Sequence, residues 1–592
     1  MLNQSMVYEH RTPLLLQTEA IDSGPTALSI ILKHFGKVVP FPELQQACTT
    51  DQGSLSTQKM VEAAAKYGLQ AKAIRCSVQT LIDNSYFLPA IVLLKNLHFV
   101  VVEAFFEDEV YLNDPECGHR TESLAEFKTT FGEFVLLLTP SKEFENKPTT
   151  ASPTIQDDLH QALADGIRGM VSAPTGKFSQ FCEDYGRIIQ KTPTVVVRAT
   201  SEADIVHTLQ VSRAQKIPVR IRGAGHSCYG QSLTDEGILL VNVADHAQFQ
   251  LEENDLVTVT TRGRWRYLEQ SLNRQQRSFP VLTDNLSTAI GGTLSVGGYG
   301  PASIRFGPQV AQVERLRLIK PDGEAVWCSR HENTQLFRYS LAGLGQVGFV
   351  EQVTLKTIPL QRGDGWWQHQ LATFQDLADV CALLEPVENR PDSFMAYYLK
   401  GRGLFACYKF TETQPSGALT TYLQQVGASQ SDSPVNLGSA YRQTESTDVY
   451  APAVDYLLPI DGLTPFLALL DEQLSQKQLF DYIPGALILG IASTPEDYFP
   501  FEAASFGTAS LKILVGFYPI VPQGDVAGLQ RVKEMMQVML TECVKQGGRP
   551  YLYGWHEMDV AMKEQLYGNA YQELHQLRKQ LDPNNLYNPH TL

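Results

Sequence analysis

Short apolar runs alternate with amphipathic stretches along the chain, and the two patterns predict different elements. Residues 26–36 (TALSIILKHFG) and 56–68 (STQKMVEAAAKYG) carry apolar residues at helical spacing and end in glycine, so we predict two helices. The apolar runs at residues 89–94 and 98–105 predict strands. Together these elements indicate a small α+β domain over residues 1–142.

A segment rich in Pro, Thr, Ser and Lys follows this domain, and we predict a linker over residues 143–164. Beyond it, residues 193–200 predict a strand, residues 201–215 a helix with acidic residues in its first turn, and residues 217–223 a second strand. The order is strand, helix, strand. Farther on, strands such as 486–492 and 511–518 are mixed with helices.

The composition narrows the class of protein. With 43% hydrophobic and 19% charged residues the chain is globular. A net charge of −16 would repel a phosphate backbone, so we expect no nucleic-acid partner. No apolar run approaches the roughly 20 residues that cross a bilayer, and the first residues lack a signal-peptide pattern, so we expect a cytoplasmic protein without a membrane partner. The nine cysteines form no CxxC pair, and we predict no metal site.

The first of three glycine-rich segments is the most informative. In residues 220–232 (RIRGAGHSCYGQS) a predicted strand runs into glycines. Gly223 and Gly225 allow positive φ and close backbone approach, so that successive N–H groups can converge on an anion such as a pyrophosphate. A glycine-rich turn after a strand is common by itself, and a single histidine beside it is more often structural than chemical.

Two further segments strengthen this interpretation. In the segment 284–310, residues 291–300 hold five glycines, which would destabilise a helix interior and weaken a strand, and therefore suggest backbone packed against a flat ligand. Residues 343–356 again place glycines directly before a predicted strand. The second segment lacks the helix and the following acidic residue of a GxGxxG dinucleotide fold.

Taken in order, the three segments resemble the FAD-binding domain of the vanillyl-alcohol oxidase and p-cresol methylhydroxylase superfamily, and within it cytokinin dehydrogenases. The family's GRGHS with GQ, TDYL, GGTLS with RxGPQ, and GLGQFG are matched by GAGHSCYGQ, TDNL, GGTLS with RFGPQV, and GLGQVG. The C-terminal LYG, RK and DPNNLYNPHT echo the family's HFG, RK, DP and PGQ. The resemblance covers about residues 165–592.

This resemblance implies an α+β multidomain protein. A vanillyl-alcohol-oxidase-type FAD-binding domain would span residues 165–361, and an α+β substrate-binding domain would span residues 362–592, with the last segment, 563–592, returning to the FAD-binding domain. The enzyme would be an FAD-dependent dehydrogenase or oxidase, reoxidised by oxygen or a quinone, with a small-molecule substrate such as a substituted adenine.

The resemblance also implies how FAD is held. His226 would carry a covalent bond to the flavin methyl group, which prevents cofactor loss and generally makes the flavin more oxidising. Berberine-bridge-type relatives add a cysteinyl link near the position of Asn285, where this chain has no cysteine, so we expect a single link. The implied cofactor-binding residues are Arg222, Gly223, Ala224, Gly225, His226, Ser227, Gln231, Asp284, Ala289, Gly292, Ser295, Tyr299, Val350, Tyr551 and Asn588.

Asp284 matches the acid of TDYL, which in cytokinin dehydrogenases receives the proton of the amine nitrogen as hydride leaves the adjacent carbon. That role needs a carboxylate of modestly raised pKa, which desolvation would provide. DNLS is also a good capping sequence, so a structural role is the alternative. Because Asn285 replaces the family's Tyr and PHT replaces PGQ, oxidation of a sugar, an alcohol or a peptide-derived product stays open.

The N-terminal domain resembles the bacteriocin-processing, papain-like cysteine peptidase domains of peptide exporters. Its segments at residues 14–36, 96–103 and 110–120 carry the likeness. By position, Gln17 matches the residue that shapes the oxyanion hole, and His98 and Asp114 match the catalytic His and Asp.

The nucleophile differs, because Ser23 stands at the position of the family's cysteine. A serine hydroxyl must be deprotonated during attack, in a site built around a larger sulfur, so peptidase activity should fall by orders of magnitude. We expect a proteolytically inactive domain, with a working serine hydrolase as the alternative. Its retained cleft would bind a peptide or protein partner, or the domain would pack on the flavin domain. A peptide-binding protein whose flavin domain is secondary is a second alternative for the whole chain.

Overall fold

The computed structural model describes residues 12–13, 15, 17, 22–37, 39–49, 56–106, 109–116, 118–141, 144, 155–172, 181–244, 247–360, 365–399, 401–410, 417–431, 449–493 and 498–589. The chain divides into two compact units. The first contains Met1–Cys182, Thr192–Ile217 and Asp235–Val241, and the second contains Glu183–Lys191, Pro218–Thr234 and Asn242–Leu592.

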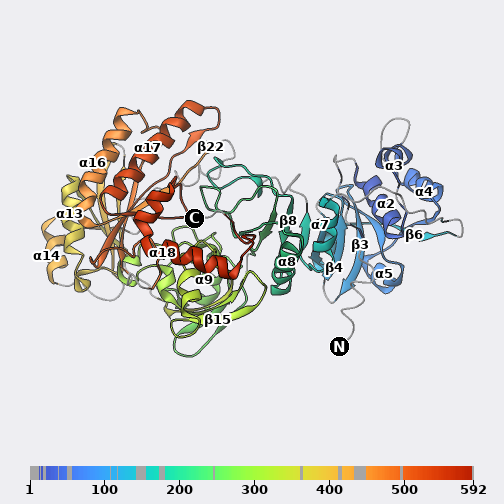
Figure 1. Cartoon of the computed structure of the whole chain (residues 1–592), viewed down its shortest axis with the longest axis horizontal. Helices are drawn as coiled ribbons and strands as arrows, with labels where there is room; N and C mark the ends of the chain where they lie inside the picture. The colour runs from blue at the N-terminus through green and yellow to red at the C-terminus, as the bar shows by residue number, and fades with distance from the viewer. Residues whose placement is uncertain are drawn as a thin grey trace. The chain divides into compact units, whose positions relative to one another are not determined.

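The first unit combines helices with a largely antiparallel sheet. Its helices are α2 (Ser23–His34), α3 (Phe41–Cys48), α4 (Thr57–Lys66), α5 (Val78–Asp83), α6 (Leu124–Thr130), α7 (Ile155–Ala164) and α8 (Glu202–Gln215). Its strands are β1 (Leu69–Arg75), β2 (Ala90–Leu94), β3 (Phe99–Phe106), β4 (Glu109–Asp114), β5 (Gly118–Ser123), β6 (Phe131–Pro140), β7 (Met170–Ser172), β8 (Val195–Arg198) and β10 (Ile238–Val241). The order β1-β6-β2-β3-β4-β5 places the N-terminal strands side by side (Figure 1).

Side-chain alternation gives this sheet two apolar faces. Ile91 and Val101 pack with α2, α3 and α4, whereas Val92, Val100 and Val102 pack with α5 and α6. A strand buried on both faces is almost continuously apolar, as β2 is, and as β3 is apart from Glu103. The two helices predicted in this domain are confirmed as α2 and α4, and the two predicted strands are β2 and β3.

The predicted linker is only partly irregular. Helix α7 occupies its second half, because Leu159 and Leu163, four residues apart, are both fully buried and anchor an amphipathic helix. The polar composition of the preceding residues concealed this helix. Residues 143 and 145–154 of the predicted linker, and the C-terminal residues 590–592, lie outside the described part of the chain.

The second unit contains two larger sheets. The strands of the first are β11 (Phe249–Leu251), β12 (Leu256–Thr260), β16 (Phe349–Lys356), β14 (Val313–Ile319) and β15 (Ala325–Ser329), in this spatial order. Those of the second are β21 (Ser429–Ser431), β18 (Trp366–Leu371), β20 (Gly403–Lys409), β19 (Ser393–Leu399), β24 (Gly485–Ala492), β25 (Leu511–Phe517), β23 (Val454–Leu458) and β27 (Arg549–Pro550), again in spatial order. Short strands complete the unit: β9 (Val219–Arg222), β13 (Arg277–Ser278), β17 (Ile358–Pro359), β22 (Val449–Tyr450) and β26 (Val521–Pro522).

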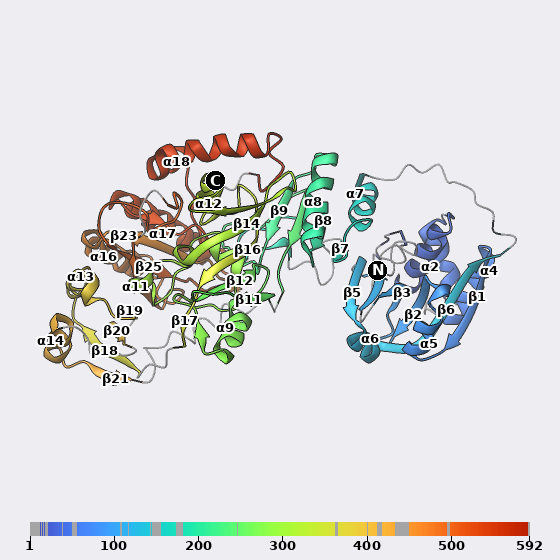
Figure 2. The same cartoon turned by 90° about the horizontal axis from the view of Figure 1, so that it is seen from below.

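Helices cover one face of the larger sheet. The helices of this unit are α9 (Trp265–Arg274), α10 (Ile290–Leu294), α11 (Ser303–Phe306), α12 (Thr334–Ser340), α13 (Phe374–Leu383), α14 (Gly417–Gln425), α16 (Ile460–Gln476), α17 (Val526–Lys545) and α18 (Val560–Leu581). Of these, α13, α16 and α17 lie along the same side of the sheet, as Figures 1 and 2 show.

The period of two residues along β24 separates the two faces of this sheet. Ala486 and Ile488 face the helices, whereas Leu487 and Leu489 face the opposite side, together with Leu514 of β25. That opposite side forms part of the cavity described below. Among the residues that the structure describes, no helix is long and apolar enough to cross a membrane.

Candidate functional site

A cavity of about 310 Å³ lies within the second unit. This volume falls in the range of ligand pockets, roughly 300–1,000 Å³. All three glycine-rich segments of the sequence contribute to its wall, and so does the apolar face of β24 and β25. Among the described residues that line it there is no Lys or Arg, and the acidic ones are Asp284 and Asp455.

The first glycine segment follows β9 as a loop. Its φ is positive at Gly225 (79°), as expected, but not at Gly223. A Cβ at position 225 would lie 2.5 Å from Nη2 of Arg222, so only glycine fits there. Arg222 lies behind the loop and is the one predicted cofactor-binding residue that does not line the cavity; all the others do.

The second glycine segment departs from its prediction in one respect. Gly291 and Gly292 lie inside the short helix α10 rather than in irregular backbone. A Cβ at Gly291 would lie 3.1 Å from the Thr261 side chain, and Gly291 donates its N–H to the Thr261 carbonyl at 3.0 Å. Close packing of backbone on backbone, together with a single helical turn, outweighs the low helix propensity of glycine here. The third segment leads directly into β16, as predicted.

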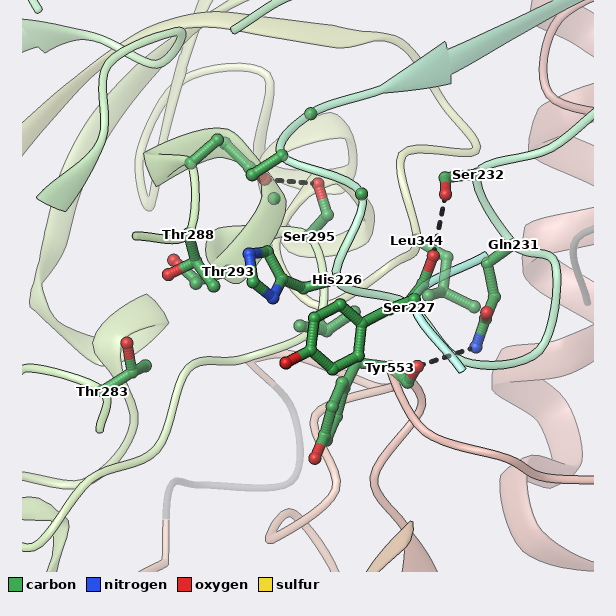
Figure 3. A pocket seen from close by; sticks show the side chains of 18 of the residues that line it. His226, Ser227, Gln231, Ser232, Thr283, Thr288, Thr293, Ser295, Leu344 and Tyr553 are labelled. Carbon is green, nitrogen blue, oxygen red and sulfur yellow. Dashed lines mark hydrogen bonds between the residues drawn. The ribbon is translucent and has the colours of Figure 1, made fainter. Parts of the chain in front are cut away.

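His226 occupies an enclosed position in the loop after β9. Its ring lies 4.8 Å from that of Tyr185, and Asn285 Nδ2 lies 3.4 Å from its Nδ1. Figure 3 shows the ring on the side of the loop that faces Thr288 and Thr293. Burial, together with the charges of Arg264 and Arg222, lowers the pKa of His226 to about 4. The imidazole is therefore neutral at physiological pH and able to act as a nucleophile.

Asp284 lies just before α10 and faces the cavity interior. The protein atoms that surround the cavity desolvate its carboxylate, and this raises the pKa of Asp284 above its usual value. The structure thus brings together the carboxylate and the histidine that the sequence singled out, although they lie 58 positions apart.

A second carboxylate, Asp455, was missed by the sequence analysis. It lies on β23 with 4% of its surface exposed, and it accepts hydrogen bonds from the hydroxyls of Tyr553 (2.6 Å) and Tyr518 (2.9 Å). Its pKa is raised to about 6: burial is the main cause, the two tyrosine hydrogen bonds oppose the rise, and the charge of Asp284 adds to it. The signal in the sequence was a lone Asp inside an otherwise apolar strand, VDYLL.

Gln231 lines the cavity, but its amide binds backbone groups. Its Nε2 donates to the carbonyls of Leu552 (2.8 Å), Gly554 (3.1 Å) and Tyr553 (3.2 Å), and its Oε1 accepts the N–H of Tyr229 at 2.8 Å. Figure 3 shows the contact with Tyr553. Beside it, Ser227 Oγ and Ser232 Oγ lie 2.9 Å apart.

The wall of the cavity suits FAD. Three glycine-containing segments expose backbone there, and at Gly223 the nearest atom to an added Cβ would be that of Ala289, 3.4 Å away, so that a side chain would occupy cavity space. Exposed backbone suits an extended cofactor with a pyrophosphate, and the apolar side chains suit a flat ring system. The residues present therefore fit the cofactor that the sequence implied.

The predicted peptidase residues gather in the first unit. His98 Nε2 lies 2.6 Å from Asp114 Oδ1, which leaves Nδ1 as the other ring nitrogen. Ser23 is the first residue of α2, is 3% exposed, and accepts the N–H of Phe99 at 3.3 Å. Gln17 donates its backbone N–H to Pro115, next to Asp114. Ser23 thus contacts the backbone of the residue that follows His98, and His98 contacts Asp114.

Asp114 is strongly stabilised as an anion. Burial alone would raise its pKa, but the hydrogen bond and charge of His98 and the charge of Arg120 bring the pKa well below its usual value. Within the described residues, His98, Asp114 and Glu116 offer ligand atoms within 4.8 Å of one another. Arg120 Nε binds Asp114 Oδ2 at 2.9 Å, and its charge opposes binding of a cation there.

Family models match both parts of the chain. The peptidase C39 family matches residues 11–143, and the FAD binding domain matches residues 193–329. The chain joins a peptidase C39 domain to an FAD-binding domain. The predicted resemblances of both parts are thereby confirmed, including the relation to cytokinin dehydrogenases described next.

Curated relatives match about a third of the chain. Oxidoreductase ORF5 of the fasciation locus of Rhodococcoides fascians is 35% identical over 173 residues, which cover 29% of this chain and 39% of the relative. Cytokinin dehydrogenase 10 of Oryza sativa subsp. japonica is 31% identical over 210 residues, which cover 33% of this chain and 38% of the relative. The chain therefore spans less than half the length of these relatives.

Solved structures share the fold of the second part. Chitooligosaccharide oxidase superposes with a TM-score of 0.59 at 14% identity and covers 73% of this chain and 98% of its own. 6-Hydroxy-D-nicotine oxidase from Arthrobacter nicotinovorans superposes with a TM-score of 0.56 at 16% identity and covers 71% of this chain and 96% of its own. At these identities the likeness establishes the fold alone.

Proposed function

We propose that the chain is an FAD-dependent oxidoreductase that removes hydride from a substrate carbon, with the cofactor bound covalently through His226. One observation carries the proposal: the glycine-lined wall, a neutral histidine and two carboxylates of raised pKa face the same cavity. FAD, when bound, supplies the hydride acceptor. The other predicted residues of the wall would hold it chiefly through backbone groups.

The chain's own residues would form the covalent link and manage the proton. The low pKa of His226 keeps its imidazole neutral, with a lone pair that can bond the flavin methyl carbon. A C–H bond of that methyl group would break, its proton would be lost to solvent, and the two electrons would pass to FAD. Asn285 stands where a cysteine would provide a second link, so one link forms. Asp284, whose carboxylate binds a proton more readily than an exposed one, would accept the proton of a substrate nitrogen.

The substrate we favour is an amine such as N-isopentenyladenine. Similarity to cytokinin dehydrogenases supports this choice. So does the lining, because Leu487, Leu489 and Leu514 offer apolar surface to a hydrocarbon side chain. The absence of Lys and Arg from the lining disfavours an anionic substrate.

The runner-up is oxidation of an alcohol, such as a sugar hydroxyl. A tyrosine backed by a buried carboxylate is suited to removing a hydroxyl proton, and Tyr553 with Asp455 forms such a pair. The fold is also shared with chitooligosaccharide oxidase. Peptide-derived products belong to the same alternative.

We also propose that the peptidase C39 domain binds a peptide or protein without cleaving it. Ser23 retains the helix start and the His98–Asp114 pair, but its hydroxyl lacks the acidity of a thiol. We assign the chain to the cytoplasm, oxygen or a quinone to the reoxidation step, and the boundaries 1–142, 143–164, 165–361 and 362–592 to the functional domains.

Two measurements on the purified full-length protein test the enzyme proposal. Visible flavin absorbance that survives acid precipitation tests the covalent link, and anaerobic bleaching of the flavin by a panel of amines, alcohols and oligosaccharides tests the substrate. We expect bleaching by N-isopentenyladenine. A colourless protein overturns the whole proposal. Bleaching by sugars but by no adenine would favour the alternative function, oxidation of an alcohol.

A further inference from the structure

Gln231 connects two loops that build the cavity wall. The first is the glycine loop that carries His226, and the second is the loop after β27, residues 551–554. Its side-chain amide donates to three consecutive carbonyls of the second loop, at 2.8, 3.2 and 3.1 Å. Cys228 adds a backbone hydrogen bond to the Tyr553 carbonyl at 2.9 Å.

The second loop is also fastened to β23. Tyr551 donates its N–H to the Asp455 carbonyl at 2.8 Å, and Trp555 donates its N–H to the Ala453 carbonyl at 2.8 Å. A Cβ at Gly554 would lie 2.6 Å from the Ala453 carbonyl oxygen, so the two backbones are in direct contact. Between these attachments, the Tyr553 hydroxyl reaches Asp455 Oδ2 at 2.6 Å.

The amide of Gln231 is held in one orientation. Its Oε1 accepts the Tyr229 N–H at 2.8 Å, so the NH₂ group must face the 552–554 carbonyls. An amide donor meets three carbonyl oxygens there, whereas a carboxylate at the same place would repel them. The arrangement therefore requires Gln rather than Glu. The hydrogen-bonding groups of the Gln231 side chain bind backbone atoms rather than a ligand.

We infer that Gln231 is a positioning residue: it fixes the backbone of Tyr553 relative to the His226 loop and so holds the Tyr553 hydroxyl on Asp455. This inference rests on the proposed function only for its catalytic consequence. The loop that would carry the cofactor and the Tyr553–Asp455 pair of the cavity wall are thereby kept in one geometry. Misplacement of a reacting group by about 1 Å can cost on the order of 100-fold in rate.

A direct test places 3-fluorotyrosine at position 553 of the full-length protein and records its ¹⁹F NMR signal. We expect Gln231→Glu and Gln231→Met to shift or broaden this signal, as Asp455→Asn does, because the hydroxyl leaves Asp455. Ser232→Ala, one residue along the same loop, is the matched control and should leave the signal unchanged, because Ser232 Oγ bonds Ser227 Oγ within the glycine loop itself. An unaltered signal in both Gln231 variants overturns the inference.

A double-mutant cycle tests the catalytic consequence. We expect Gln231→Glu to slow flavin reduction by N-isopentenyladenine 10- to 100-fold, while the acid-stable flavin is retained. If Gln231 acts through Tyr553, the variant that combines it with Tyr553→Phe reduces at the rate of Tyr553→Phe alone. Additive losses overturn the inference. Failure of the adenine to bleach the wild type counts against the proposed substrate, and the ¹⁹F signal then decides the role of Gln231 independently.

Discussion

The Tyr553 hydroxyl donates a 2.6 Å hydrogen bond to Oδ2 of Asp455, a carboxylate that is 4% exposed and has a pKa of about 6. This pair joins a loop near the C-terminus to strand β23, on the side of the sheet that faces away from the helices. It places a proton acceptor in the cavity wall. The local sequence around either residue does not predict this contact, because the two residues lie 98 positions apart in the chain. Two predictions concern this pair.

Asp455→Asn should stabilise the protein while impairing the reaction. A carboxyl with a raised pKa binds its proton more tightly in the folded than in the unfolded state, so it lowers stability as the pH rises from about 4 to about 6. Replacement by Asn should therefore gain about 3 kcal/mol above pH 6 and nothing below pH 4. Thermal unfolding of both proteins across this pH range measures the gap. A variant that is less stable than the wild type at pH 8 contradicts the prediction.

Tyr553→Phe should move the acid limb of the reaction. Its hydrogen bond lowers the pKa of Asp455, so removing it should raise that pKa above about 6 and demand a higher pH for the active form. The rate of anaerobic flavin reduction by an alcohol should also fall by about 10- to 1,000-fold. Tyr518→Phe, which removes the other hydrogen bond to Asp455, is the comparison: it should shift the limb but keep more of the rate. Equal losses in the two variants would assign no special role to Tyr553.

His226→Ala should abolish acid-stable flavin, because no other neutral nucleophile is expected to bond the flavin methyl group. The matched control is Cys228→Ala. Cys228 lies two residues away in the same loop, and burial raises the pKa of its thiol far above neutrality, so it cannot supply a thiolate. Absorbance of the acid-precipitated protein should vanish in the first variant and persist in the second. Persistent colour in His226→Ala would remove the proposed link.

Asp284→Asn should slow flavin reduction by an amine about 100- to 10,000-fold, because the amide cannot accept a proton. Comparison with Asp455→Asn separates the two candidate functions. If Asp284 is the acceptor for a nitrogen, its replacement is the more damaging of the two for amine substrates. The opposite order, with alcohols as the better reductants of the flavin, would favour the alternative in which Tyr553 and Asp455 act on a hydroxyl.

Ser23→Cys should create a reactive thiol in the peptidase C39 domain. A cysteine at the start of α2, near the His98–Asp114 pair, should ionise readily, whereas burial raises the pKa of Cys48 to about 12. Alkylation by iodoacetamide at pH 6, followed by peptide mass mapping, should label the introduced thiol and spare Cys48. Adding His98→Ala should slow the labelling. Slow labelling of the single variant would show that the site no longer forms a thiolate–imidazolium pair.

The three glycine-rich segments, taken in order, predicted the cavity wall. Glycine is needed there because the backbone conformation and the close contacts leave no room for a side chain. At Gly225, positive φ and the nearby Arg222 exclude a Cβ, and that requirement is visible in the sequence itself. The position of helix α10 is not visible in the sequence. It depends on the packing of Gly291 against Thr261, which lies far away in the chain, so local helix propensity does not predict it. Helix α7 was not predicted because its buried residues, Leu159 and Leu163, follow a polar stretch that indicated a linker.

The sequence by itself determined the two domain types and the two candidate site residues, His226 and Asp284 of the TDNL motif. Short motifs and their order along the chain suffice for these predictions. Only the tertiary structure decided that Asp455 faces the same cavity as His226 and that Gln231 holds a loop more than 300 positions away. The physical reason is that a strand's alternation fixes which side chains share a face, but the surface against which that face packs depends on contacts between distant segments. Burial, and with it the raised pKa of Asp455, arises only there.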